Sequence, residues 1–127
     1  MIDPLTLELL ESEWSIARLA PDDPVPDWAW SAELCSVSRT CDELSVLAPS
    51  AQVPDDVRCE RAFRAMIVQG PLPFDAKGIL ADLSAAIAEA GISLLAISTF
   101  DTDVVLVRQD DLDAAVAALH RRGHAIT

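Results

Sequence analysis

Apolar and polar positions in the second half of the chain follow two helical and four strand-like patterns. Apolar residues recur at the spacing of one helix face from Gly78 to Ala90 and again from Asp110 to Arg122. Strand-like apolar runs stand around these two stretches, at 61–68, 92–98, 103–108 and 124–127. The order strand, helix, strand, strand, helix, strand predicts an α+β module of the ferredoxin-like βαββαβ type.

The four glycines of the chain, Gly70, Gly78, Gly91 and Gly123, all fall at breaks in this pattern. Gly91 and Gly123 directly follow the two predicted helices, where a left-handed residue commonly ends a helix. The glycines therefore support the same element boundaries as the apolar periodicity.

The first half of the chain differs in composition, because it contains six of the eight prolines of the whole chain, all at or before position 54. Its pattern predicts two hairpins, 6–10 with 14–19 and 33–39 with 43–47, and about one helical turn at 27–30. Shifting the sequence by 60 residues aligns the apolar positions of 37–47 with those of 97–107. We therefore expect two modules, a degenerate one over 1–57 and a complete one over 58–127.

Composition and charge narrow the function classes. The net charge is −12, from 21 acidic and 9 basic residues, which disfavours binding to nucleic acid or to anionic membranes. The first residues resemble no signal peptide and no apolar run is long enough to span a bilayer, so we expect a cytoplasmic protein. Three cysteines without CxxC spacing indicate neither a disulfide framework nor a zinc site.

The remaining chemistry-bearing residues suggest neither a cofactor nor a catalytic centre. His120 and His124 have no Cys or Asp at metal-ligand spacing, and we expect both to be surface residues. No arrangement of Ser or Cys with His and Asp suggests a nucleophile. The sequence thus predicts a protein that is not an enzyme and has no metal.

The best candidate for a ligand site is the segment 71–78 before the first predicted helix. Asp75 is predicted to cap that helix, whose unpaired backbone N–H groups suit a carboxylate. Gly78 lets a ligand or another backbone approach closely. The alternative is an ordinary helix start in which Asp75 caps the helix and Gly78 serves packing.

A second candidate feature is the turn from Ser98 to Asp103, which we expect close to that helix start. Asp103 opens an otherwise apolar strand, and its carboxylate suits an ammonium or guanidinium group, while Phe100 covers an aliphatic part. Asp103 as a solvated turn residue is the alternative. Together the two features predict a site that holds a zwitterion at both of its charges.

Three segments, Gly91 to Leu112, Gly70 to Ile79 and Trp14 to Leu19, carry a resemblance to a known family. They resemble the small ACT-domain proteins related to the CASTOR arginine sensors. The resemblance implies two ACT modules in tandem, the first degenerate, and a regulatory protein that binds an amino acid without catalysis. It does not identify the protein that would be regulated.

The resemblance also implies where the amino acid would bind, between two ACT modules. One module would supply Phe74, Asp75, Gly78, Ile79, Thr99, Phe100 and Asp103. The other would supply Ser93 and Leu94, and a homodimer of two C-terminal modules would provide both sides. The arginine-sensing relatives carry an acidic residue just before the helix glycine, where this chain has Ala76 and Lys77. Arginine is therefore not the expected ligand, and Lys77 would instead favour a ligand with an additional carboxylate.

Two other function classes remain open at this point. An ACT fold without a small-molecule site would act as an assembly module that pairs through its edge. An enzyme would use Asp75 and Asp103 as an acid–base pair, but two carboxylates alone give that reading little support.

Overall fold

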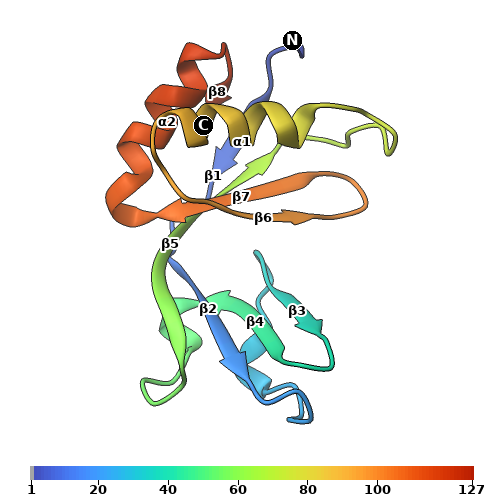
Figure 1. Cartoon of the computed structure of the whole chain (residues 1–127), viewed down its shortest axis with the longest axis vertical. Helices are drawn as coiled ribbons and strands as arrows, with labels where there is room; N and C mark the ends of the chain where they lie inside the picture. Colours follow the sequence, from blue (N-terminus) through green and yellow to red (C-terminus); the bar gives the residue numbers. More distant parts are fainter. Residues whose placement is uncertain (1) are drawn as a thin grey trace. The chain divides into compact units, whose positions relative to one another are not determined.

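The structure is a computed structural model that describes residues 2–127 and contains two compact units (Figure 1). Unit 1 combines residues 2–11 with Arg64–Thr127, and unit 2 comprises Ser12–Phe63. The chain therefore begins in unit 1, forms all of unit 2, and re-enters unit 1 within strand β5 (Cys59–Val68). The predicted division into 1–57 and 58–127 differs from these units mainly in residues 2–11, and as a statement about domains it stays a prediction.

Unit 1 contains the predicted strand–helix–strand–strand–helix–strand order. After the second half of β5 come α1 (Ile79–Glu89), β6 (Leu95–Ser98), β7 (Asp103–Arg108), the short 3₁₀ turn η3 (Gln109–Asp111), α2 (Leu112–Arg121) and β8 (Ala125–Ile126). Helix residues Leu83, Ile87 and Leu119 join strand residues Met66 and Val105 in one buried core. The helical periodicity of the sequence thus marks the faces that pack on the sheet.

The sheet of unit 1 contains one strand more than the predicted module. Strand β1 (Thr6–Leu9) lies between β5 and β8, so the order is β6-β7-β5-β1-β8. Leu7 pairs antiparallel with Val68 and parallel with Ile126. The predicted hairpin of 6–10 with 14–19 is therefore wrong, because burial of Leu7 in the helix-covered core favours distant partners over a local turn.

Unit 2 is built from strands and short turns. It contains β2 (Trp14–Leu19), β3 (Ser36–Arg39), β4 (Leu44–Pro49), the first half of β5, and the 3₁₀ turns η1 (Asp27–Ala29) and η2 (Ser50–Gln52). The strand order is β3-β4-β2-β5, which confirms the predicted hairpin of 33–39 with 43–47. The single turn η1 confirms the short helical segment expected at 27–30.

The core of unit 2 is formed mainly by small and branched apolar residues, namely Ala17, Ala29, Leu44, Val46, Ala48 and Val53. Unit 2 contains no α-helix among its described residues. The α+β fold of the chain is thus confirmed in unit 1, while a second ACT module in unit 2 stays a prediction. In the described part of the chain, no helix has the length and apolar character needed to cross a membrane.

Candidate functional site

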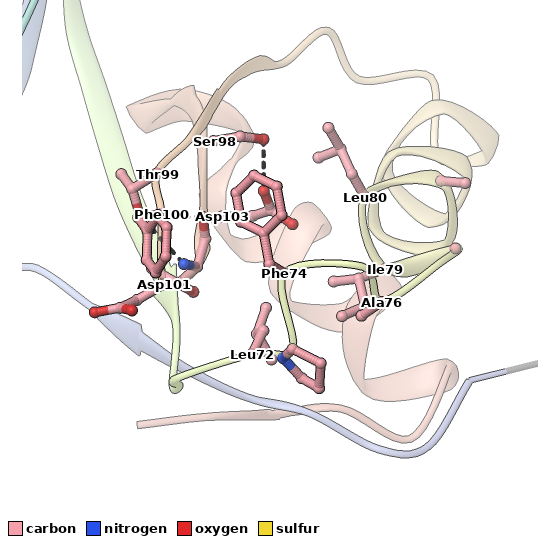
Figure 2. Close-up of a pocket in the computed structure, with 14 residues that line it drawn as sticks. Leu72, Phe74, Ala76, Ile79, Leu80, Ser98, Thr99, Phe100, Asp101 and Asp103 are labelled. Atoms are coloured by element: carbon pink, nitrogen blue, oxygen red, sulfur yellow. Dashed lines mark hydrogen bonds between the residues drawn. The ribbon is translucent and has the colours of Figure 1, made fainter.

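A hollow of about 340 Å³ opens in unit 1 between the start of α1 and the turn that joins β6 to β7 (Figure 2). Six of the nine predicted site residues line it: Phe74, Gly78, Ile79, Thr99, Phe100 and Asp103. Leu72, Ala76, Leu80, Ala81, Ser98 and Asp101 are among the other lining residues. The structure thus brings together the segment 71–78 and the turn from Ser98 to Asp103, which were expected to lie close together.

The first wall of the hollow is the amino-terminal end of α1. Gly78 is its N-cap residue, with a left-handed φ of 86°, and its carbonyl accepts the first helical bond from the N–H of Asp82 at 2.9 Å. The backbone N–H groups of Ile79, Leu80 and Ala81 therefore have no partner within the helix. All three residues line the hollow, so this positive end of α1 faces it.

The prediction that Asp75 caps this helix is wrong. The helix begins at Ile79, and no side chain donates or accepts a capping hydrogen bond there. Asp75 lies in a turn closed by the bond from the Ala76 N–H to the Pro73 carbonyl at 3.0 Å. This turn holds Asp75 away from the helix start, and its side chain is exposed and does not line the hollow.

The second wall is the turn from Ser98 to Asp103. The Thr99 N–H donates to the Thr102 carbonyl at 2.8 Å, and the Thr102 N–H donates to Thr99 Oγ1 at 3.1 Å. Asp103 is half-buried and its Oδ1 accepts a hydrogen bond from Ser98 Oγ at 2.6 Å, drawn as a dashed line in Figure 2. This carboxylate is thus held at the edge of the hollow while it retains acceptor capacity.

Backbone contacts join the two walls behind the hollow. The Leu72 N–H donates to the Asp101 carbonyl at 2.7 Å, and the Thr102 hydroxyl donates to the Val68 carbonyl. A side chain at Gly70 would meet both the Asp101 oxygen and the Leu72 nitrogen at 3.0 Å. Glycine at this position therefore permits the close approach of the two segments.

Two aromatic rings bridge the walls at the rim. Phe74 and Phe100 are each 79% exposed, and their ring centroids lie 5.3 Å apart with a 35° tilt between the planes. Such a tilted arrangement is favourable for a pair of aromatic rings. Two large apolar side chains in contact with each other and with water form a surface suited to a ligand or a partner.

The charges around the hollow are negative. Its lining contains the carboxylates of Asp101 and Asp103 and no Lys, Arg or His, and Figure 2 shows the Asp101 carboxylate directed away from Asp103. Lys77 is exposed and does not line the hollow. The lining therefore offers no side chain that would attract a second carboxylate.

Ser93 and Leu94 do not line this hollow. Leu94 packs partly against the core of its own unit, and Ser93 is exposed just before β6. Within unit 1, β6 pairs only with β7 among the described strands, so its other edge is open to a further strand. The predicted role of these two residues in a second module stays a prediction.

A polar cluster joins α1 to the residues that follow α2, and it was not expected from the sequence. Its members are Asp82 and Glu89 of α1 with Arg122 and His124. His120 is exposed, as predicted. The prediction that His124 lies at the surface is wrong, because only 3% of this residue is exposed. Its Nε2 lies 2.7 Å from Asp82 Oδ2, and Arg122 donates to Asp82 Oδ1 at 2.7 Å and to Glu89 at 2.9 Å. In the sequence, the only signal is a histidine and an arginine that follow a helix.

The hydrogen bond from His124 lowers the pKa of Asp82 below its ordinary value, and partial burial opposes this effect. The hydrogen bond and charge of Arg122 add to the lowering. Asp82 is therefore ionised at neutral pH. The described residues include no group of three or more His, Cys, Asp or Glu side chains that would hold a metal ion.

Two family models match parts of the chain. A family model described as the ACT domain matches residues 58–121, and a model of an N-terminal domain matches residues 12–56. In the curated relative Aspartate kinase Ask_Ect of Stutzerimonas stutzeri, 48 residues are 54% identical, and they make up 35% of this chain. The matched region is only 10% of that relative's length.

Solved structures share the whole fold. A protein from Agobacterium tumefaciens is 33% identical, with a TM-score of 0.93, over 99% of this chain and 94% of its own. The ligand-free regulatory subunit of aspartate kinase from Thermus thermophilus has a TM-score of 0.65 at 11% identity, over 91% of this chain and 95% of its own. ACT domains are regulatory domains. By its family match over half of its length and by its fold, this chain belongs to the ACT-domain family.

Proposed function

We propose that this protein is a regulatory protein, not an enzyme, that binds a free amino acid in the hollow of unit 1. The observation that carries the proposal is that Ile79, Leu80 and Ala81, whose amides have no partner within the helix, line one hollow together with Asp103. A free amino acid is the smallest common molecule that has a carboxylate and an ammonium group side by side. Membership of the ACT-domain family supports the same class of ligand.

In this proposal the ligand carboxylate accepts hydrogen bonds from the α1 amides, and its ammonium group donates to Asp103. The Phe74 and Phe100 rings cover its aliphatic part. Hydrogen bonds to charged groups contribute about 1.5–3 kcal/mol each. Two or three of them contribute about 3–9 kcal/mol before the cost of ordering the ligand is subtracted. Micromolar affinity corresponds to about −8 kcal/mol, so it requires the upper part of this range together with burial of the aliphatic part.

The charges of the lining favour some amino acids over others. Because the lining contains two carboxylates and no basic side chain, an acidic amino acid would be repelled by Asp101 and Asp103. The earlier expectation that Lys77 favours an additional carboxylate receives no support from its position outside the lining. We therefore propose that the ligand is a neutral or basic amino acid. We also propose that the chain is related to the CASTOR sensors.

We further propose that two copies of the chain form a homodimer that completes the site. In an antiparallel pairing of two β6 strands, the start of one strand lies beside the end of the other. Ser93 and Leu94 of one copy would then approach Ser98 and Thr99 of the other, which line the hollow. The open edge of β6 and the exposed phenylalanine pair support this arrangement.

The second candidate function is an assembly module without a small-molecule ligand. The same exposed Phe74–Phe100 pair and the same open edge of β6 favour it, because both suit a protein partner. The two candidates differ in whether an amino acid changes the stability of the fold.

A thermal-shift screen against the twenty common amino acids tests the proposal. A ligand at 100 times its dissociation constant stabilises the folded state by about 2.7 kcal/mol. We expect a shift with a neutral or basic amino acid and none with aspartate or glutamate. A flat response across the panel would favour the assembly module. Light scattering with and without the best amino acid then determines whether the ligand changes the oligomeric state.

Asp103→Ala is the decisive variant for the site. We expect it to abolish the amino-acid shift and to leave the melting point without ligand nearly unchanged. The reason is that, among the described residues, the Asp103 carboxylate accepts a single exposed hydrogen bond, from Ser98. Asp101→Ala is the matched control, since it removes a carboxylate two residues away that points away from Asp103. A full ligand response in Asp103→Ala, or an equal loss in both variants, would show that Asp103 is not the ammonium anchor.

A further inference from the structure

Asp82 connects the end of α1 that lines the hollow to the polar cluster behind it. It follows directly after Ile79, Leu80 and Ala81, and its own N–H makes the first bond of the helix, to Gly78 at 2.9 Å. Its two carboxylate oxygens bind different donors, Oδ2 with His124 and Oδ1 with Arg122, each at 2.7 Å. The first turn of α1 is thus held by a side chain as well as by the backbone.

His124 is the best-fixed member of this cluster. The Leu5 N–H donates to its Nδ1 at 3.0 Å, so Nδ1 is an acceptor and carries no hydrogen. The hydrogen of the ring therefore lies on Nε2 and is donated to Asp82. With 3% of the residue exposed and both nitrogens bonded, any rotation of the ring breaks two hydrogen bonds in a buried place.

The other ties of the first turn are weaker. No side chain caps α1, and Arg122 is partly exposed and shares its guanidinium with Glu89, which is 70% exposed. Exposed ion pairs of that kind contribute little. His124 is therefore the donor that best fixes the position of Asp82, and with it the direction of the three preceding amides.

We propose that His124 is a positioning residue for the amino-acid site: through Asp82 it orients the backbone amides of Ile79, Leu80 and Ala81 toward the ligand carboxylate. The inference rests on the proposed function of the hollow. Its physical basis is that hydrogen bonds weaken steeply when donor and acceptor are misaligned, so a small rotation of the first turn costs affinity.

His124→Gln tests this role against His120→Gln, the same substitution on an exposed residue four positions earlier. Isothermal titration uses the amino acid that gives the largest shift in the twenty-member panel, at a temperature where all variants are folded. We expect His124→Gln to weaken binding about fivefold, the equivalent of one hydrogen bond, and His120→Gln to leave it unchanged. Equal affinities of both variants would overturn the proposal.

Amide NMR spectra give a readout without ligand. We expect His124→Gln to move the signals of Ile79, Leu80 and Ala81 and to leave those of Thr99 and Phe100 in place. The imidazole nitrogen spectrum of the wild type should show a neutral ring protonated at Nε2. Unmoved amide signals, or a ring protonated at Nδ1, would contradict the positioning role even if no amino acid binds.

Asp82→Asn is the second variant, for the case in which His124→Gln does not fold. It keeps the shape of the side chain but removes the charge, so one amide oxygen must replace two carboxylate oxygens. The same amide signals should move in this variant as in His124→Gln. If the wild type binds none of the twenty amino acids, the proposed function fails, while these spectra still decide the role of His124.

Discussion

The two units place left-handed backbone at different kinds of residue. In unit 1 the positive φ angles of the described residues occur at Gly78, Gly91 and Gly123. Gly78 directly precedes α1, and the other two follow α1 and α2. In unit 2, Ala62 is the described residue with a positive φ, of 67°, inside β5 where its pairing with β2 shifts register. Glycine lets helices start and stop in unit 1 without strain, whereas unit 2 accommodates a strained alanine in a bulge.

The hollows of the two units also differ. In unit 2, a hollow of about 250 Å³ is lined by residues of both charges in strands or directly beside them, including Arg18, Arg58, Glu43 and Glu60. The hollow of unit 1 instead combines the free amides of a helix with a carboxylate on a strand. In unit 1 the positive partner of the carboxylate is the fixed end of a helix, whereas in unit 2 both charges come from flexible side chains.

The largest expected effect on this comparison comes from the core of unit 1. Leu83 is fully buried between α1 and the sheet, and Leu83→Ala should lower the free energy of unfolding by about 2–5 kcal/mol. Leu44→Ala is the matched variant in unit 2, where Leu44 is also fully buried. Chemical denaturation measures both. A loss below about 1 kcal/mol for Leu83→Ala would contradict the packing of α1.

The helix-end glycines give the next largest effect. Gly78→Ala and Gly91→Ala each force a side chain into a left-handed conformation, which costs about 1–2 kcal/mol. An added Cβ at Gly91 meets nothing within 4 Å, so its cost is that of the backbone alone. Thermal melts should show similar losses, but only Gly78→Ala should weaken amino-acid binding. If both variants weakened amino-acid binding equally, binding would not depend specifically on the start of α1.

Acid should remove a smaller part of the stability. Because the pKa of Asp82 is lowered in the folded state, the unfolded state binds its proton more readily. The contribution of Asp82 is therefore complete above its ordinary carboxyl range near pH 4 and is lost as the pH falls through the lower folded value. Asp82→Asn should lack this part of the acid dependence in denaturation curves between pH 2 and 7. Identical curves for wild type and variant would contradict the ion pair.

The smallest expected change is a gain. Ala62→Gly relieves a left-handed alanine, worth about 1–3 kcal/mol, but glycine loses about 0.5–1 kcal/mol through its freer unfolded chain. We expect a net stabilisation of about 1 kcal/mol from denaturant titration. A destabilised variant would mean that Ala62 is not strained, and the contrast with the glycines of unit 1 would disappear.

Much of the site was accessible from the sequence, but its finer assignments were not. A helix start predicts the segment 71–78 as one wall, and an acidic residue at the head of an apolar strand predicts the turn at 98–103 as the other. Asp75 is a common type of capping residue, yet a local turn removes it and leaves Gly78 at the cap. His124 bonds Leu5 and Asp82, which are far from it in sequence, so no local pattern indicates its burial.

The sequence by itself determined the two helices and the strands β5 to β8 of unit 1 and their order. The reason is that apolar periodicity and glycine breaks are local signals, each carried by residues close together in the chain. Only the tertiary structure decided the place of β1 between β5 and β8, the burial of His124, and the exclusion of Asp75 from the hollow. The first two depend on contacts between distant segments, whose free energy is gained only when a common core forms.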